Sequence, residues 1–309
     1  MAEVTSEPQL QELVPGVHAW IQPDGTWWIN NAGAVHSGGE VVLIDTCATA
    51  RRTRLFLDAL DAATGGAPIR LAVNTHLHGD HVYGNALLPD ETVIVAHEHT
   101  RQGILQDFIL ANTPPVWSPT PEWGVDAVRA PTVSFRDEIT LHAGGKPVVV
   151  RHPGYSAHTV GDAVAWLPED GVLFTGDLVF HRVTPMIAMG SLDGALRSLD
   201  WLAAFEPAVV VPGHGPVVPG AAFAEVLDAH RRYYEFVGHT AETGRDKGWT
   251  PLEAARQADL GEFADLPDAE RLVLNLHRAY ADADGVEINI AAALGDAIAY
   301  NGGPLACAV

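Results

Sequence analysis

Cysteine and lysine are almost absent from this sequence of 309 residues. Its two cysteines, Cys47 and Cys307, exclude a framework of disulfide bonds and a metal site built from several thiolates. Lysine occurs only at Lys146 and Lys247. No run of apolar residues approaches the ~20 that a membrane-spanning helix needs, so no membrane span is predicted.

Basic charge is scarce as a whole. The 18 Lys and Arg residues face 39 Asp and Glu residues, which gives a net charge of −21. A surface this negative repels phosphate backbones and anionic lipids, so nucleic acid and membranes are excluded as partners. The start of the chain, Met1 to Pro15, is polar and acidic and does not resemble an export signal, which predicts a cytoplasmic protein. The oligomeric state stays open, a homodimer included.

Apolar residues make up 47% of the chain, enough for a large core, and their spacing alternates between strands and helices from Val14 to about Pro216. Residues 41–44 form a continuous apolar run typical of a buried strand, and residues 51–63 have helical spacing. The other predicted strands cover 69–73, 92–96, 147–151, 162–167, 172–175 and 208–211, the other helices 98–110 and 191–205, and a long loop 113–131.

Two such halves in succession predict two sheets packed face to face with helices outside, an α/β (α+β) fold. We expect residues 1–219 to form this core. Residues 220–309 are mostly helical in pattern, with a break around Gly244 to Thr250, and we expect them to pack on the core.

The loop after the strand 69–73 is crowded with metal-ligand types. It reads Thr75-His76-Leu77-His78-Gly79-Asp80-His81. Neutral imidazole and carboxylate suit zinc or a similar metal. Asp80 and His81 are adjacent and must diverge, which favours two metal ions over one. Gly79 removes a side chain where the backbone has to turn sharply.

Three further candidates lie beside glycines at predicted strand ends. His158 follows Gly154, Asp177 follows Gly176, and His214 stands between two glycines. With the first loop they supply five histidines and two aspartates, enough for two metal ions with positions open for water. Structural metal sites are usually closed and rich in cysteine, so this set favours catalysis.

The whole series resembles the metallo-β-lactamase superfamily, whose signature is an H-x-H-x-D-H loop followed by His, Asp and His. The resemblance covers roughly residues 14 to 216 and implies an αββα sandwich, here with a helical C-terminal extension. It assigns the ligands as follows. His76, His78 and His158 would hold the first metal ion; Asp80, His81 and His214 would hold the second; Asp177 would bridge them.

This resemblance implies a dinuclear metal-dependent hydrolase, with zinc expected and iron or manganese as alternatives. Two divalent ions would activate a bridging hydroxide, which would attack an ester, thioester or lactone of a small acyl substrate. Asp80 would be catalytic, since it would orient the water or receive its proton. Protons compete with metal for five imidazoles, so we expect metal and activity to be lost below about pH 6.

A narrower resemblance lies in residues 22–33, 176–180 and 184–191, which are similar to a bacterial subgroup associated with aromatic polyketide biosynthesis. Its members are cyclases or thioesterases that act on carrier-bound acyl chains. Aromatic and thioether side chains near the predicted loops would form an adaptable apolar wall. The predicted substrate pocket contains Trp28, Tyr155, His181, Met186 and Met189.

Other readings of the same residues remain open. The metals could act as Lewis acids in an aldol cyclase without hydrolysis, a single iron could support an oxygenase of the same fold, or the chain could bind metal without turnover. Metal analysis separates these classes, because two zinc ions per chain favour a hydrolase or cyclase and one iron favours an oxygenase.

Overall fold

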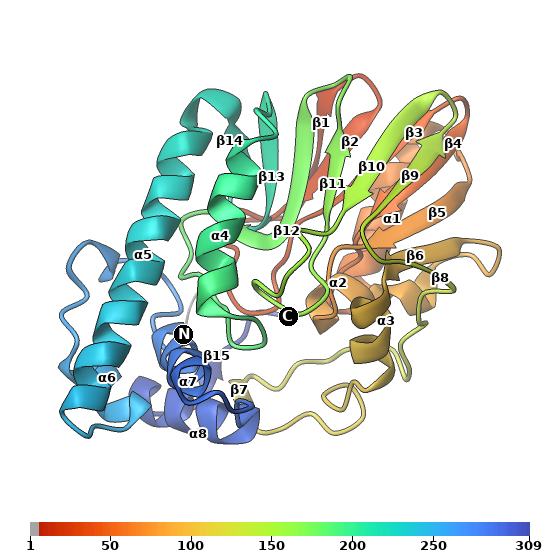
Figure 1. The fold of residues 1–309 in the computed structure, drawn as a ribbon. Coiled ribbons are helices and arrows are strands. Elements are labelled where there is room, and N and C mark those ends of the chain that lie inside the picture. Colours follow the sequence, from red (N-terminus) through yellow and green to blue (C-terminus); the bar gives the residue numbers. More distant parts are fainter. Residues whose placement is uncertain (1–5) are drawn as a thin grey trace.

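The computed structural model describes residues 6–309. The first residues of the predicted acidic N-terminus and of the predicted 1–219 core therefore lie outside the described part. Two β-sheets pack face to face with helices on both outer sides, as the sequence pattern predicted (Figure 1). Within residues 6–309 no helix combines the length and apolarity needed to cross a membrane.

The first sheet has seven strands in the order β1-β2-β3-β4-β5-β6-β8. Strands β1 to β4 pair antiparallel, and β4, β5, β6 and β8 pair parallel. The strands are β1 (Gln9–Val14), β2 (Val17–Ile21), β3 (Ala32–Ser37), β4 (Glu40–Ile44), β5 (Ile69–Asn74), β6 (Val93–His97) and β8 (Val133–Phe135).

The second sheet has six strands in the order β14-β13-β12-β11-β10-β9. Its pairs are antiparallel except β12 with β13, which run parallel and so end at the same edge. The strands are β9 (Glu138–Ala143), β10 (Lys146–Arg151), β11 (Val164–Leu167), β12 (Val172–Phe180), β13 (Val209–His214) and β14 (Val218–Pro219).

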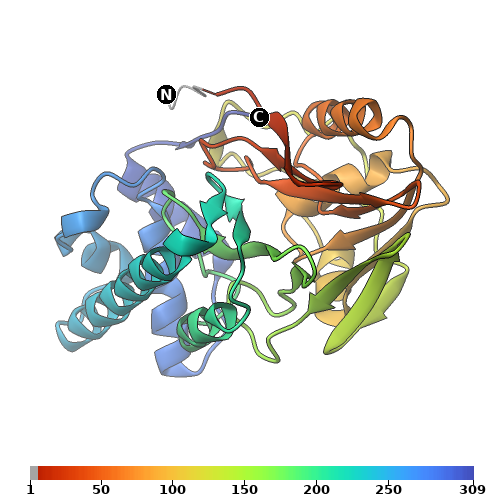
Figure 2. The same cartoon turned by 90° about the horizontal axis from the view of Figure 1, so that it is seen from above.

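Helices cover both outer faces of the sandwich. Figure 2 shows α1 on one outer side and α4 with α5 on the other. The α-helices are α1 (Ala50–Thr64), α2 (Gly79–Val82), α3 (Glu98–Leu105), α4 (Leu192–Ala203), α5 (Gly220–Asp246), α6 (Pro251–Gln257), α7 (Arg271–Asp284) and α8 (Ile290–Asn301). Two short 3₁₀ helices are η1 (Tyr83–Leu87) and η2 (Gly261–Phe263).

Alternation along the strands divides the core into layers. In β4, Val42 and Ile44 belong to the cluster between the sheets, whereas Val41 and Leu43 pack with Phe56 of α1. Successive strand side chains point to opposite faces, so a strand that is apolar throughout is buried on both sides. This explains why the run 41–44 shows no polar alternation.

The C-terminal helices share one apolar cluster with the outer face of the second sheet. Leu173 of β12 and Val210 of β13 belong to the same buried cluster as Leu272 of α7 and Leu294 of α8. The last strand, β15 (Leu305–Ala306), pairs in parallel with β7 (Trp117–Ser118), which lies inside the predicted long loop 113–131.

Several predicted boundaries were wrong. Helix α3 ends at Leu105 rather than at residue 110, because the Asp107 carboxylate accepts the backbone N–H of Leu110 and starts a separate turn. Strand β12 runs beyond residue 175 to Phe180. Asp162 precedes β11 rather than beginning it, since its carboxylate accepts backbone N–H groups of the preceding turn. Strands β1 to β3, β7 to β9, β14 and β15 were not predicted.

Candidate metal centre

All seven predicted ligand residues lie together at one edge of the sandwich. His76 and His78 follow β5, and Asp80 and His81 lie in α2. The other three come from the second sheet: His158 from the loop between β10 and β11, Asp177 from within β12, and His214 from the last position of β13. The sequence placed Asp177 at a strand end, whereas the strand continues for three residues past it.

The seven side chains form two groups. In each group the candidate ligand atoms lie within 4.8 Å of one another. The groups are His76, His78, His158 and Asp177, and Asp80, His81 and His214. Apart from the half-buried His78, all of them are buried.

The Asp177 carboxylate lies between the two groups. Its Oδ2 atom is 3.4 Å from His158 Nε2 and 3.3 Å from His214 Nε2. Its Oδ1 atom is 3.1 Å from His81 Nε2. One carboxylate therefore contacts imidazoles of both groups, as a residue shared between two ions would.

Contacts on the outer side of each imidazole fix its orientation. His158 donates from Nδ1 to the backbone oxygen of Met186 at 2.6 Å, and His78 contacts Met189 Sδ through Nε2 at 3.3 Å. The other three histidines have outer partners on Nδ1: Thr75 Oγ1 for His76, Asp45 Oδ2 for His81 and the Gly25 backbone oxygen for His214. A ring nitrogen that donates outward leaves the other nitrogen with a lone pair facing inward.

The inward atoms fit bound cations. Within residues 6–309, the buried atoms His76 Nε2, His81 Nε2 and Asp177 Oδ1 have no hydrogen-bond partner, although the last two lie 3.1 Å apart. His158 Nε2 and His78 Nδ1 face each other at 2.9 Å, although each has its outer contact on the other ring nitrogen. Opposed lone pairs and orphaned buried acceptors are costly unless a cation or proton lies among them.

Burial dominates the electrostatics of the first group. It lowers the pKa of His76 well below its ordinary value, lowers that of His78, and lowers that of His158 to about 3. These rings are therefore neutral at pH 7, the form in which imidazole binds metal.

The second group behaves in the opposite way. Burial lowers the pKa of His81 and His214, but the charges of Asp177 and Asp80 outweigh it, raising the His81 pKa well above normal and that of His214 to about 9. Burial likewise raises the Asp80 pKa, but His81 and His214 lower it to about 2. Without metal this group holds protons that a cation would replace.

Asp45 supports the site, although it was not among the predicted site residues. It is buried in a left-handed conformation, at φ 58°, and accepts from His81 Nδ1 at 2.9 Å and from the Thr75 backbone N–H at 2.7 Å. An acidic residue directly after an apolar strand, opposite the histidine loop, was the signal that would have identified it.

Replacing Asp45 with asparagine should weaken metal binding at the group that contains His81. The amide lacks the charge that orients and polarises this imidazole, and losing such outer contacts costs about 10–100-fold in metal affinity. Zinc titration of the purified variant checks this. Asp61→Asn, in α1, is the control; an Asp45 variant with unchanged affinity would contradict the role.

Gly213 explains why β13 approaches β12 so closely. A Cβ atom built on it would lie 1.9 Å from Asp177 Oδ1. Gly176, at φ 51°, would place a Cβ 2.6 Å from Thr75 Oγ1. Both positions need glycine, because any side chain would displace the carboxylate or the loop that carries His76. Gly79 has a different role from the predicted turn, since its Cβ would meet the Tyr83 ring at 2.3 Å.

A mainly apolar cavity of about 370 Å³ opens onto the two groups. His78, Asp80, Asp177 and His214 form its polar end. Its apolar lining includes Trp27, Trp28, Trp117, Leu77, Phe108, Phe180, Met186, Met189, Leu274 and Leu294. The C-terminal helices α7 and α8 therefore supply part of the wall.

Three of the five predicted pocket residues, Trp28, Met186 and Met189, line this cavity. Tyr155 and His181, also predicted there, are not among the residues that line it. The Tyr155 ring packs against the Arg197 guanidinium of α4 at 4.0 Å, and His181 donates from Nδ1 to the Pro216 backbone oxygen at 2.9 Å.

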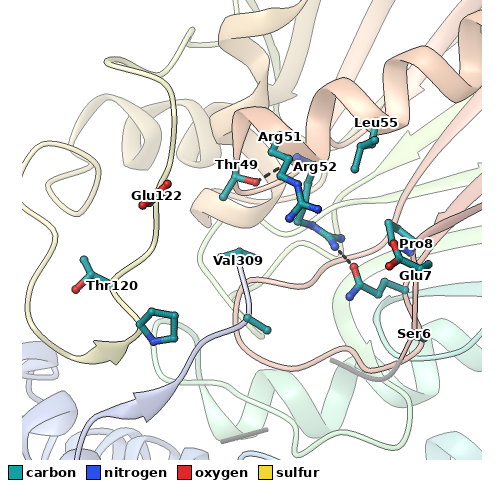
Figure 3. Close-up of a pocket in the computed structure, with 13 residues that line it drawn as sticks. Ser6, Glu7, Pro8, Thr49, Arg51, Arg52, Leu55, Thr120, Glu122 and Val309 are labelled. Carbon is teal, nitrogen blue, oxygen red and sulfur yellow. Dashed lines mark hydrogen bonds between the residues drawn. The ribbon is translucent and has the colours of Figure 1, made fainter. Parts of the chain in front are cut away.

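A second cavity, of about 500 Å³, lies at the start of α1 (Figure 3). There the Thr49 side chain caps α1 by accepting the Arg52 backbone N–H, and the Arg52 guanidinium binds Gln22. The lining described for this cavity includes neither group of candidate ligands. Candidate ligands line the first cavity.

Comparison with known proteins places these features in a family. The family model described as Metallo-beta-lactamase superfamily matches residues 25–214. Hydroxyacylglutathione hydrolase from Rhizobium meliloti (strain 1021) is 29% identical over 240 residues, which cover 76% of this chain and 83% of the relative. Linear primary-alkylsulfatase from Pseudomonas sp. (strain ATCC 19151) is 25% identical over 260 residues, 71% of this chain and 48% of that protein.

Solved structures show the same fold. A metallo-beta-lactamase from Pontibacter korlensis superposes with a TM-score of 0.59 at 22% identity, covering 74% of this chain and 99% of that one. The sec-alkylsulfatase Pisa1 from Pseudomonas sp. gives a TM-score of 0.68 at 20% identity, covering 89% of this chain and 50% of that one. The match to most of the chain by the family model, together with the converging histidines and aspartates, shows that this chain belongs to the metallo-β-lactamase superfamily of hydrolases.

Proposed function

We propose that the chain is a dinuclear zinc hydrolase that cleaves an ester or thioester of an apolar acyl group. The observation that carries this proposal is the apolar cavity that ends at His78, Asp80, Asp177 and His214. A metal-dependent hydrolase must place the substrate bond that it cleaves at the metal centre. An apolar wall beside that centre favours substrates that carry an apolar group next to this bond.

The proposed ligand roles follow the two groups. His76, His78 and His158 would hold one ion, Asp80, His81 and His214 the other, and Asp177 would contact both. Bound zinc lowers the pKa of water and polarises the carbonyl oxygen of the substrate. Imidazole with carboxylate suits zinc, and zinc is the metal we propose.

Asp80 has a second proposed task. Its Oδ2 atom is 3.2 Å from His214 Nε2, and the residue also lines the cavity, so it lies where substrate and water meet. The Asp80 pKa of about 2 keeps this carboxylate ionised at neutral pH. An ionised oxygen there can orient the attacking water and accept its proton.

Acyl thioesters of increasing chain length test the proposal. With the zinc-loaded protein we expect kcat/KM to rise with each added CH₂ until the cavity is filled, because burying one CH₂ contributes about 0.8 kcal/mol, roughly fourfold in rate. Absence of thioester and ester hydrolysis, or a preference for acetyl groups, would contradict it.

Truncation of the cavity wall should shift this preference. Leu294→Ala, in α8, lengthens the cavity, so we expect longer acyl chains to become the better substrates while acetyl esters are little changed. Leu60→Ala is the matched control, because Leu60 is also buried but lies in α1, on the outer side of the first sheet. A similar shift in both variants would argue against the assigned wall.

Alkyl sulfate esters are the second candidate substrate. The match to the sec-alkylsulfatase covers 89% of this chain, and Arg271 of α7 supplies a cationic side chain to the cavity lining. The same apolar wall suits an alkyl chain. Release of sulfate from dodecyl sulfate, measured beside the thioester series, distinguishes the two candidates.

A narrower form of the proposal is a polyketide-derived, carrier-bound acyl thioester. Its basis is the resemblance of residues 22–33 and 176–180 to the polyketide subgroup, and a cavity with aromatic walls accommodates such a chain. An aldol cyclase would convert a poly-β-ketone without releasing a thiol. Thiol release therefore separates thioesterase from cyclase action, and one iron per chain in the purified protein would instead favour an oxygenase.

A further inference from the structure

Residues 184–189, between β12 and α4, contact two of the candidate ligands from outside. The Met186 backbone oxygen accepts from His158 Nδ1 at 2.6 Å, and Met189 Sδ is 3.3 Å from His78 Nε2. Both histidines belong to the first group. We call residues 184–189 the bridging segment.

The bridging segment is itself held by the C-terminal helices. Asn275 of α7, fully buried at 0% exposure, accepts the Ile187 backbone N–H at 2.8 Å and donates to the Pro185 backbone oxygen at 2.8 Å. Its amide also donates to the Tyr233 hydroxyl of α5 at 3.1 Å. One side chain thus accepts a hydrogen bond from the segment, donates another to it, and links it to the C-terminal helices.

A neighbouring contact supports the same attachment. Arg271, one turn before Asn275, donates from Nη1 to the Thr184 backbone oxygen at 3.0 Å. The outer contacts of the second group are with other residues. His81 donates to Asp45, which follows β4 of the first sheet, and His214 donates to the Gly25 backbone oxygen. The hydrogen bonds of the Asn275 side chain therefore reach the first group through the bridging segment, and none of those three bonds involves Asp45 or Gly25.

From these contacts we propose that Asn275 is a positioning residue for the first metal site, acting through the bridging segment on His158 and His78. The inference rests on the ligand roles proposed above. An outer hydrogen bond fixes which ring nitrogen faces the metal and how the ring is turned, and metal affinity depends on both. The helical region is then part of the metal centre as well as a wall of the cavity.

The experiment compares zinc binding by the wild type, Asn275→Ala and Asn275→Asp. We expect two zinc ions per wild-type chain. In Asn275→Ala one ion should stay tightly bound and the other should bind about tenfold or more weakly in competition with a chelator. Asn275→Asp keeps an acceptor for Ile187 and should fall between the two. With cobalt in place of zinc, the absorption bands of one site should change and those of the other should persist.

His277→Ala is the matched control, because His277 lies on the same helix but binds Asp296 at 2.8 Å, away from the bridging segment. It should keep both ions. A wild type that binds no zinc would remove the proposed function itself. A wild type with two ions, beside folded Asn275 variants whose affinities stay within about twofold of it at both sites, would overturn the inference alone.

A measurement on the wild type decides the matter if the variants fail to fold. The Ile187 backbone N–H donates to Asn275. Coupling between two sites is reciprocal, so if Asn275 strengthens zinc binding, bound zinc must stabilise this hydrogen bond. Zinc should therefore slow the hydrogen exchange of the Ile187 amide. Unchanged exchange of the Ile187 amide on zinc saturation would overturn the inference.

Discussion

Asp177→Ala is expected to abolish hydrolysis and to remove both metal ions. Asp177 is the carboxylate that contacts imidazoles of both groups, 3.1 Å from His81 and 3.4 Å from His158. Its loss removes one member of the first group and the carboxylate that His81 and His214 of the second group both contact. We expect kcat/KM to fall by about a thousandfold or more, which corresponds to about 4 kcal/mol of transition-state stabilisation.

Asp80→Ala should behave differently, since within residues 6–309 the ion pairs of Asp80 are with histidines of the second group, His214 at 3.2 Å and His81 at 3.7 Å. One zinc ion should remain, with activity still greatly reduced. Zinc content and thioester hydrolysis of the two variants, measured side by side, check both expectations.

Asp177→Asn serves as the control for shape, because it keeps the size of the side chain and removes its charge. It should resemble Asp177→Ala in metal content. Retention of two ions by Asp177→Ala, or a wild-type rate in Asp80→Ala, would contradict the ligand scheme.

Acid should release the two ions at different pH values. The sequence predicted one loss below about pH 6, but the pKa values of the two groups differ in direction. A group with a raised pKa keeps its proton up to that pH, so protons compete for His214, pKa about 9, throughout the neutral range. Burial lowers the pKa of His158 to about 3, so protons do not compete for it above about pH 4.

The second site should therefore lose its ion first as pH falls, with an affinity that drops up to about tenfold per pH unit for each proton bound. Zinc per chain, measured by equilibrium dialysis from pH 9 to pH 4, should fall in two steps. Loading of the second site at pH 7 should also release protons, measurable by calorimetry in buffers of different ionisation enthalpy.

Two variants show which site loses its ion in each of the two steps of the pH titration. His158→Ala should keep the acid-sensitive ion, and His214→Ala should keep the acid-resistant one. Release of both ions from the wild type at a single midpoint, or loss of the His158-containing site first, would contradict the expected order.

The ligand loop was predictable because the residues that identify it lie close together in the sequence. Four candidate ligands with a fixed spacing, His76, His78, Asp80 and His81, follow an apolar strand, and glycines flank His214 on both sides. The two-sheet fold was predictable for a similar reason, since runs such as 41–44 are apolar throughout and must be buried on both faces.

Other features depend on contacts that are distant in sequence. Nothing near Asn275 indicates that its amide binds residues 185 and 187, and Tyr155 lies close to His158 in sequence although its ring turns to Arg197. Strands such as β1 carry polar residues on exposed positions, so their apolar pattern is weak. Tertiary packing decides these cases, and a single sequence does not contain it.

The pairing of β15 with β7 affects how the protein is made. Trp117, in the cavity wall, gains its strand partner only at Leu305 and Ala306, and Leu305 donates its N–H to the Val116 backbone oxygen at 2.7 Å. During synthesis from the N-terminus, the ribosome must therefore release the chain as far as Ala306 before this wall can close. The candidate metal-binding histidines would therefore be synthesised long before the cavity wall is complete.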